Sequence, residues 1–385
     1  MDSYMDEVYG RIVARLRSNT TDQAESVLRV PAAHFTDPAH LARELAVFRR
    51  VPVNAAMSCE LPGPGSFVTR DILGVPLLIV RGKDGVVAAL RNMCRHRGAK
   101  VELRARGQRN LFMCSYHGWS YDSSGALRGV PYDAELGGID KNCNGLQSLR
   151  CAERHGIIWV NVSNEAGEDV ADWLGPADAR LAAYEVERKV IHMEKRLDVP
   201  VNWKLVMDGA IDILHPQFLH PEGVGKLIHT SAALWIPHGR HGHSYSARKR
   251  FAEKVLAGES YERNWRYLGG NFMLFPNAYL IPTPDHYEYW NVWPHLTHPG
   301  RCHVHIRFLV NPQTLTPEVA ARIARSWEIL ETAATTEDFP IEETIQANAA
   351  SAPEVDFIYG RAEAPCQHLH RQMAAHIAAP PGERA

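Results

Sequence analysis

Two short motifs, each pairing a cysteine with a histidine, constrain this chain more than any other feature of its 385 residues. The first reads Cys94-Arg-His96-Arg-Gly, and the second, which begins after seventeen intervening residues from His96, reads Cys114-Ser-Tyr-His117-Gly-Trp. A two-iron, two-sulfide cluster with two thiolates on one iron and two imidazoles on the other needs this ligand set. A zinc finger instead places two cysteines before two histidines, with a different gap. We therefore expect Cys94, His96, Cys114 and His117 to hold an iron–sulfur cluster.

Further residues of the two motifs add to this pattern. Arg97-Gly98 and Gly118-Trp119 directly follow the ligand pairs, and with them the pattern resembles the Rieske [2Fe–2S] domain. A domain of that kind alone is an electron carrier of roughly a hundred residues, so the length of this chain predicts a second unit with a large core.

Charge and cysteine content limit the partners and the compartment. The formal net charge is −2 with mixed signs, which indicates neither a nucleic acid nor an anionic membrane as partner. The first residues lack a signal peptide's basic start and apolar run, and no stretch reaches the roughly twenty apolar residues that cross a bilayer. Five of the seven cysteines lie outside the motifs, and we expect them to be reduced thiols in a cytoplasmic protein.

The spacing of apolar residues predicts helices and strands around the two motifs. We expect helices at residues 1–30, 37–50, 169–188, 317–336, 340–350 and 360–378. We expect strands at residues 72–80, 86–90, 156–162, 190–198, 279–282, 287–293 and 303–310. The fold class is therefore α+β, with a small β domain embedded in a larger domain made by the rest of the chain.

A second group of ionisable residues lies in an otherwise apolar segment. Treated as one helix, the segment places Asp208, Asp212 and His215 on one face, at positions i, i+4 and i+7. Buried ionisable groups cost several kcal/mol unless they are paired or bound to a metal. Pro216 should kink this helix and let His220 swing toward His215. Two imidazoles and one carboxylate form the facial triad of oxygen-activating non-haem iron.

Both groups of residues together resemble the catalytic α subunit of Rieske non-haem iron oxygenases, over nearly the whole chain. In that family an Asn-Trp-Lys opening precedes Asp-x-x-His-x4-His, which here falls on Asp212, His215 and His220. The resemblance implies that both histidines bind a mononuclear iron and that Asp212 links the two metal sites through hydrogen bonds. It also implies that the third iron ligand lies on a downstream helix. For this ligand we choose Asp338, with Glu342 as second choice and Glu337 as third. Carboxylates at a helix N-terminus also oppose the helix dipole, which accounts for some of this acidic cluster.

The resemblance also implies the architecture and the cofactors. It divides the chain into a helical segment at 1–43 that packs with the catalytic domain, a Rieske domain at 44–162, and a helix-grip-like catalytic domain with a central antiparallel sheet at 163–385. Each subunit would hold one Rieske cluster and one mononuclear Fe(II). The subunits would form a head-to-tail homotrimer, with or without a β subunit, that brings the cluster of one subunit near the iron of its neighbour.

The implied activity is hydroxylation of an aromatic or other hydrophobic ring substrate with O2. The sequence carries no flavin or nicotinamide fingerprint, so electrons from NAD(P)H would come through a separate reductase, with or without a ferredoxin. Oxidative O- or N-demethylation, or hydroxylation of a steroid-like skeleton, uses the same machinery and stays open. A pure electron carrier would lack the triad.

Two segments have open roles around the iron. Tyr287, Tyr289, Asn291 and Trp293 share one face of a predicted strand, and they either fill the core or line a substrate cavity. The histidine-rich stretch that ends at Arg248-Lys-Arg250 is either a solvated loop or a lid.

Overall fold

The computed structural model describes residues 3–163, 168–260 and 268–379 and divides into two compact units. The smaller unit comprises Phe48–Trp173 and Ala179–Val190. The larger unit comprises Met1–Val47, Leu174–Asp178 and Ile191–Ala385. The domain boundaries expected at 43/44 and 162/163 stay predictions.

Short antiparallel strands build the smaller unit. The sheets have the strand orders β10-β5-β4-β3-β6, β11-β12-β2 and β7-β8-β9. Their bounds are β2 Val53–Met57, β3 Ser66–Ile72, β4 Val75–Arg81, β5 Val87–Arg91, β6 Arg106–Gln108, β7 Leu111–Met113, β8 Ser120–Asp122, β9 Leu127–Gly129, β10 Ser148–Leu149, β11 Cys151–Arg154 and β12 Ile157–Val160. The single strand predicted at 72–80 is wrong at its start, because Leu73 and Gly74 turn the chain with φ of 53° and 78°. Aliphatic and aromatic side chains form the core of this unit together with Cys94 and Cys114.

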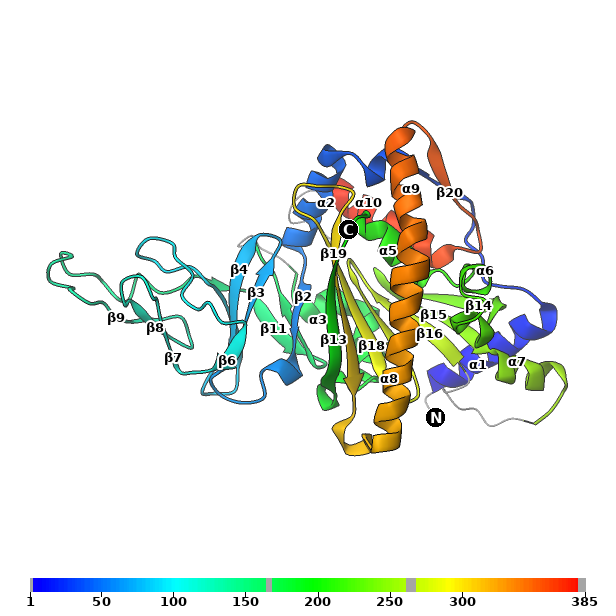
Figure 1. Ribbon diagram of the computed structural model, residues 1–385, viewed down its shortest axis with the longest axis horizontal. Coiled ribbons are helices and arrows are strands. Elements are labelled where there is room, and N and C mark those ends of the chain that lie inside the picture. The colour runs from blue at the N-terminus through cyan, green and yellow to red at the C-terminus, as the bar shows by residue number, and fades with distance from the viewer. Residues whose placement is uncertain (1–2, 164–167, 261–267, 380–385) are drawn as a thin grey trace. The chain divides into compact units, whose positions relative to one another are not determined.

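A seven-stranded antiparallel sheet dominates the described part of the larger unit, in the order β13-β19-β18-β17-β16-β15-β14 (Figure 1). The strands are β13 Val190–Val199, β14 Ile228–His238, β15 His241–Arg248, β16 Leu268–Leu274, β17 Ala278–Pro282, β18 Tyr287–Pro294 and β19 Cys302–Val310. The alternating and apolar runs predicted at 190–198, 279–282, 287–293 and 303–310 all form strands. The predicted α+β class, with a large antiparallel sheet, is confirmed.

The helices are α1 Ser3–Ser18, α2 Pro38–Arg50, α3 Val170–Leu174, α4 Asp178–Ala182, α5 Trp203–Ile211, α6 Pro216–Leu219, α7 Lys249–Leu256, α8 Pro317–Thr332, α9 Phe339–Ser351 and α10 Ala364–Ala378. The helix predicted at 1–30 is wrong beyond Ser18. Asn19 adopts a left-handed φ of 49°, and β1 Leu28–Pro31 pairs with β20 Asp356–Tyr359. The helix predicted at 169–188 is interrupted at Gly175-Pro176, since proline removes a backbone donor.

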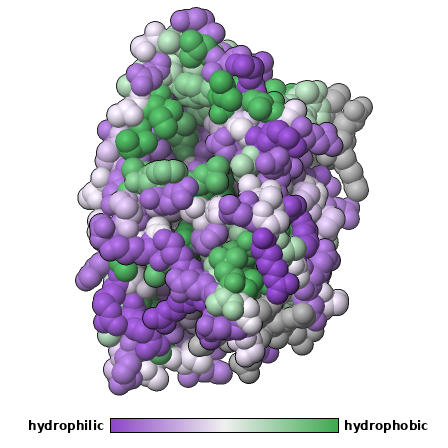
Figure 2. Space-filling model, turned by 90° about the vertical axis from the view of Figure 1, so that its right-hand side faces the viewer, coloured by the Kyte–Doolittle hydropathy of each residue, from purple (hydrophilic) through white to green (hydrophobic). Residues whose placement is uncertain are grey.

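The described residues contain no helix that is long and apolar enough to cross a membrane. The face of the molecule in Figure 2 is mostly hydrophilic and carries separate apolar patches rather than one continuous apolar surface.

Three consecutive residues fix the start of α5 within the larger unit. Asn202 caps the helix by accepting from the Lys204 backbone N–H, and its side-chain amide donates to the carbonyls of Phe35 and Pro299. The Trp203 indole N–H donates to Glu44 over 2.8 Å, and the Lys204 ammonium donates to the same carboxylate over 2.5 Å. The Asn-Trp-Lys opening is therefore an anchor that joins α5 to α2.

The Glu44 carboxylate is fully buried. Burial alone raises the pKa of a carboxyl, but Lys204 and His40 outweigh it and lower the pKa of Glu44 to about 2. A carboxyl with a lowered pKa stabilises the fold fully above its unfolded pKa of about 4.5, and this contribution is lost as the pH falls through about 2.

We predict that Glu44→Gln destabilises the larger unit by roughly 3–5 kcal/mol, because it leaves the buried Lys204 charge unpaired. Urea unfolding at neutral pH, followed by tryptophan fluorescence, measures this change. Glu7→Gln is the matched control, because Glu7 is exposed and pairs only loosely with Arg11, at 3.8 Å. The control should stay within roughly 0.5 kcal/mol of the parent protein. Equal stability of the two variants would contradict the anchor.

Candidate metal centres and active-site cavity

The two cysteine–histidine motifs fold into matching loops. The Cys94 N–H donates to the Ala99 carbonyl and the Gly98 N–H donates to the Cys94 carbonyl, over 2.8 and 2.9 Å. The second loop repeats both bonds at the same two distances, from Cys114 to Trp119 and from Gly118 to Cys114. Gly98 and Gly118 take φ of 78° and 72°, a left-handed conformation that glycine adopts without strain. The glycine after each ligand pair is thus required by the turn.

The four predicted cluster ligands lie together between these loops. Both thiols are buried, and burial raises the pKa of Cys94, with the neighbouring Cys114 thiol adding to the shift. The His96 and His117 rings are 4.6 Å apart between centroids. The Nδ1 atom of His96 is buried and has no hydrogen-bond partner among the described residues. Two adjacent thiols, two adjacent imidazoles and an orphaned ring nitrogen fit a two-iron cluster with mixed ligands.

Two aromatic side chains lie next to these ligands. The sequence placed Trp119 only loosely and did not single out Tyr121. Trp119 stacks on His96 with centroids 5.1 Å apart. The Tyr121 hydroxyl lies 3.3 Å from the Cys94 Sγ atom and accepts from the Arg95 backbone N–H. Tyr121 carried no sequence signal, since nothing in its spacing differs from an ordinary strand residue.

The helix expected to carry Asp208, Asp212 and His215 on one face is wrong. Helix α5 ends at Ile211, and Asp212 is extended, with φ −70° and ψ 134°. Pro216 begins the separate helix α6, because a proline cannot donate within a continuous helix but fits the first turn of a new one. Asp208 instead accepts from the Tyr359 hydroxyl and lies 2.9 Å from the His370 Nε2 atom.

Asp212 shapes the turn between these helices. Its two oxygens accept from the backbone N–H groups of Leu214 and His215, over 2.9 and 3.1 Å. One of them also lies 3.0 Å from the Nδ1 atom of His215. Burial raises the pKa of Asp212, but these hydrogen bonds outweigh it and hold the pKa below its usual value. Asp212 is therefore a carboxylate that orients the His215 ring.

The structure brings His215, His220 and Asp338 together. One potential ligand atom from each lies within 4.8 Å of the others. The Asp338 Oδ1 atom is 2.9 Å from His220 Nε2 and 3.8 Å from His215 Nε2. His220 Nδ1 is held by the Glu337 carboxylate over 2.6 Å. Each histidine thus has a carboxylate on Nδ1 and presents Nε2 to the same point, an arrangement typical of metal-binding histidines.

The acidic residues near this group have distinct positions. Glu337, the third choice as iron ligand, contacts Nδ1 of His220, on the ring side away from Asp338. With Asp338 it outweighs the burial of His220 and raises that histidine's pKa. Glu342, the second choice, is buried outside the three-residue group, and burial raises its pKa to about 8. The geometry therefore favours Asp338 as the third ligand.

A π-helical turn, Ala333–Asp338, presents Glu337 and Asp338 between α8 and α9. The Thr335 and Thr336 hydroxyls donate to backbone carbonyls four residues earlier, and Pro340 has no N–H to donate. Both features weaken the regular helical ladder at this place. Wide turns of this kind recur at functional sites.

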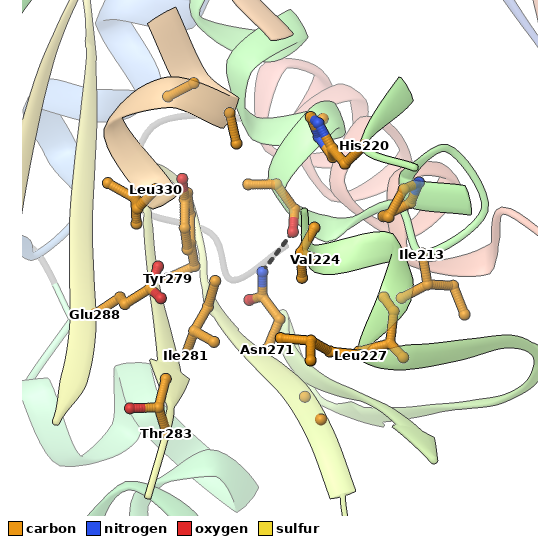
Figure 3. A pocket seen from close by; sticks show the side chains of 18 of the residues that line it. Ile213, His220, Val224, Leu227, Asn271, Tyr279, Ile281, Thr283, Glu288 and Leu330 are labelled. Carbon is orange, nitrogen blue, oxygen red and sulfur yellow. Dashed lines mark hydrogen bonds between the residues drawn. The ribbon is translucent and has the colours of Figure 1, made fainter. Parts of the chain in front are cut away.

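A cavity of about 370 Å³ adjoins the three residues. Its walls come from the α5–α6 segment, strands β15 to β18, helix α8 and the π-helical turn. Figure 3 shows Ile213, Val224 and Leu227 on one wall and Ile281 and Glu288 on the sheet opposite. The residues of β18 that line it are Glu288 and Trp290, so of the two roles left open for the face that carries Tyr287, Tyr289, Asn291 and Trp293, the cavity lining is wrong. Tyr289 and Asn291 are buried on the other face of β18.

The histidine-rich stretch is neither a solvated loop nor a lid. Its residues form β14, β15 and the start of α7, and His238, His241 and His243 are buried. Of this stretch's cations, Arg248 lines the cavity.

The amino-acid sequence is similar to those of known proteins. The chain is 29% identical over 220 residues to the glycine betaine monooxygenase oxygenase subunit of Chromohalobacter salexigens, covering 56% of this chain and 49% of the relative. It is 32% identical over 210 residues to the terephthalate 1,2-dioxygenase terminal oxygenase component subunit alpha 2 of a Comamonas species, covering 50% and 49%. The chain thus spans about half the length of the curated relatives it matches.

Solved structures show the same fold. The quaternary ammonium Rieske monooxygenase CntA in complex with an inhibitor aligns with a TM-score of 0.79 at 19% identity, over 91% of this chain and 96% of that one. Naphthalene 1,2-dioxygenase from a Rhodococcus species, bound to indole, aligns with a TM-score of 0.74 at 20% identity, over 99% and 100%.

Family models cover both units. The Rieske [2Fe-2S] domain matches residues 51–149, and the ring hydroxylating alpha subunit catalytic domain, which binds mononuclear non-haem iron, matches residues 185–379. The resemblance seen in the sequence is therefore confirmed, and the chain belongs to the ring hydroxylating alpha subunit family.

Proposed function

We propose that this chain is the terminal oxygenase component of a multicomponent Rieske oxygenase. Cys94, His96, Cys114 and His117 hold its [2Fe–2S] cluster, and His215, His220 and Asp338 hold its mononuclear iron. A separate reductase, with or without a ferredoxin, supplies electrons from NAD(P)H. The five cysteines outside the two motifs are free thiols, which supports a reducing cytoplasm as the compartment.

The observation that carries the proposal is the convergence of two Nε2 atoms and one carboxylate beside a cavity. Three protein ligands leave coordination positions open for dioxygen on a non-haem iron. A volume of about 370 Å³ and largely apolar walls suit a small organic molecule. A pure electron carrier would need neither feature.

The protein's own residues supply orientation and exclusion of water. When bound, the mononuclear iron supplies oxygen activation, and the cluster supplies electrons one at a time. Asp212 and Glu337 fix the ring orientations of His215 and His220. Ile213, Val224 and Leu227 keep the substrate side of the cavity apolar.

Two reaction types remain within the proposal. Relatives named as anthranilate and terephthalate 1,2-dioxygenases favour ring dihydroxylation, whereas those named as glycine betaine and carnitine monooxygenases favour monooxygenation, with demethylation as one form. A substrate screen with a surrogate reductase, reading oxygen uptake and product mass together, separates them. Absence of coupled oxygen uptake with every substrate and reductase would contradict the proposal.

The proposed assembly is a head-to-tail homotrimer, with or without a β subunit. In it a cluster histidine of one subunit, His96 or His117, hydrogen-bonds Asp212 of the next. The partly exposed Asp212 carboxylate, 18% accessible, supports this role because it can receive another donor.

We predict that the purified protein is red-brown and contains about two acid-labile sulfides per chain. Cys114→Ser should abolish the visible bands, because a serine hydroxyl does not replace the thiolate. Cys143→Ser is the control, since Cys143 is an exposed thiol of the same unit. Absorption spectra, together with sulfide and metal analysis, test this prediction. A colourless, zinc-loaded protein with oxygenase activity would refute the cluster.

We predict that His215→Ala and His220→Ala each lose the mononuclear iron and turnover while the cluster spectrum stays unchanged. The two ligand sets are separate, and losing one of three ligands weakens the site severely. Iron analysis and product formation measure the effect. His303→Ala, which changes an exposed histidine of β19, should behave as the parent protein. Substantial product from either ligand variant would mean that the triad is misplaced.

We predict that the Asp212→Asn variant keeps both metals and a reducible cluster. Its pre-reduced cluster should be oxidised roughly 10–100-fold more slowly than that of the parent protein. The amide keeps the shape and weakens charge-assisted hydrogen bonds. Single-turnover kinetics with substrate and oxygen give the rate. Glu337→Gln makes the same change on the other histidine and is the control, which should not slow cluster oxidation in iron-replete protein. Parent-like oxidation in Asp212→Asn would remove the linking role.

A further inference from the structure

The sheet side of the cavity carries an unusual acidic group. The Glu288 carboxylate, from β18, lines the cavity beside Tyr279 and above Thr283, opposite the apolar wall of the α5–α6 segment (Figure 3). Its side chain is only 16% accessible. Burial raises the pKa of Glu288 to about 7, and the nearby Trp290 indole only partly opposes this rise.

The described residues provide no cation for this carboxylate. The nearest partner is His286 Nε2 at 3.9 Å, and burial lowers the pKa of His286 to about 4, so that ring is neutral at physiological pH. Arg248, the one arginine or lysine among the described cavity residues, lies on β15. Three strand spacings separate β15 from β18, about 14 Å across the sheet. Arg322 is already bound by Asp285, over 2.8 and 3.0 Å.

A carboxylate buried without a partner is costly, and a glutamine would fill the same volume at a lower cost. Such groups persist where a ligand provides the missing charge. The cavity therefore favours a positively charged guest over a neutral or anionic one at the Glu288 side.

Two aromatic rings stand next to Glu288. Trp290 follows it on the same face of β18, and Tyr279 is the cross-strand partner of Trp290, with ring centroids 5.3 Å apart. Burial raises the pKa of Tyr279, and the negative charges of Glu288, Glu342 and Asp338 add to this rise. Aromatic faces beside a carboxylate attract organic cations, including fully alkylated ammonium groups.

We propose that Glu288, with Tyr279 and Trp290, binds an amine or ammonium group of the substrate. This inference rests on the proposed function, because it takes the cavity as the place of oxygenation. With the cation held at β18, the rest of the molecule lies along the apolar wall, toward His215, His220 and Asp338. Glu288 is thus a residue that determines specificity, and it takes no part in oxygen activation.

The test uses pairs of probes that share a shape and differ in charge. Choline is paired with 3,3-dimethylbutan-1-ol, and benzylamine with benzyl alcohol. Calorimetry on the anaerobic, iron-loaded enzyme measures each dissociation constant. The cation of at least one pair should bind about tenfold more tightly than its neutral isostere, as expected for a charge-assisted contact.

Glu288→Gln should bring that ratio close to one, since the amide keeps the hydrogen bonds and loses the charge. Asp285→Asn is the matched control. It removes a carboxylate that lines the same cavity but is already paired with Arg322, so the preference should persist.

Equal affinities within every pair, no binding of either cation, or an undiminished preference in Glu288→Gln would each overturn the inference. The comparison within the parent enzyme stands even if the variant does not fold. Binding needs no turnover, so its outcome is independent of the oxygen-uptake test of the proposed function. A protein that consumes oxygen with neutral substrates and binds no cation would retain the function and lose the inference.

Discussion

The metal-binding geometry of the larger unit depends on two carboxylates that hold two imidazole rings. A free imidazole can present either nitrogen, and only a partner on Nδ1 fixes Nε2 as the atom available to a metal. Asp212 does this for His215 within one turn of the chain, and Glu337 does it for His220 from the π-helical turn. Asp338 directly follows Glu337 in the chain. The turn that holds Glu337 against His220 therefore also brings the third ligand, Asp338, to the site. The cavity lies on the remaining side of the site, between the ligands and strands β17 and β18.

These short-range contacts require that α5 and the π-helical turn keep their places. The Asn202-Trp203-Lys204 anchor fixes α5 through a buried carboxylate on α2, and Asn271 donates to the Ala210 carbonyl near its other end. Thr335, Thr336 and Pro340 weaken the regular ladder at the turn that carries Asp338. The larger unit therefore buries charged groups in two places. At Glu44 they fix the position of α5, and at the metal site they hold the ligand histidines. In both places each buried charge has a partner, which distinguishes them from Glu288.

Sequence spacing predicted the features that depend on neighbours along the chain. The two cysteine–histidine motifs predicted the four residues that lie together in the smaller unit, and alternation predicted strands of the large sheet. Regular helical periodicity failed at Asp212, because Pro216 ends one helix and starts another. Alternation along β18 separated two faces but could not show which one meets the cavity, so Glu288 and Trp290 were missed. The partner of Lys204 and the role of Glu337 are contacts across 160 and 117 residues, for which one sequence carries no signal.

The central claim is that one chain holds a two-iron cluster and a separate mononuclear iron on the residues named above. An anomalous difference map from crystals of the iron-loaded protein, measured at the iron absorption edge, tests it most directly. The account predicts density for the cluster among Cys94, His96, Cys114 and His117. It predicts a separate single peak bounded by His215 Nε2, His220 Nε2 and the Asp338 carboxylate. A peak ligated by Glu342 in place of Asp338, or no iron beside the two histidines, would contradict it.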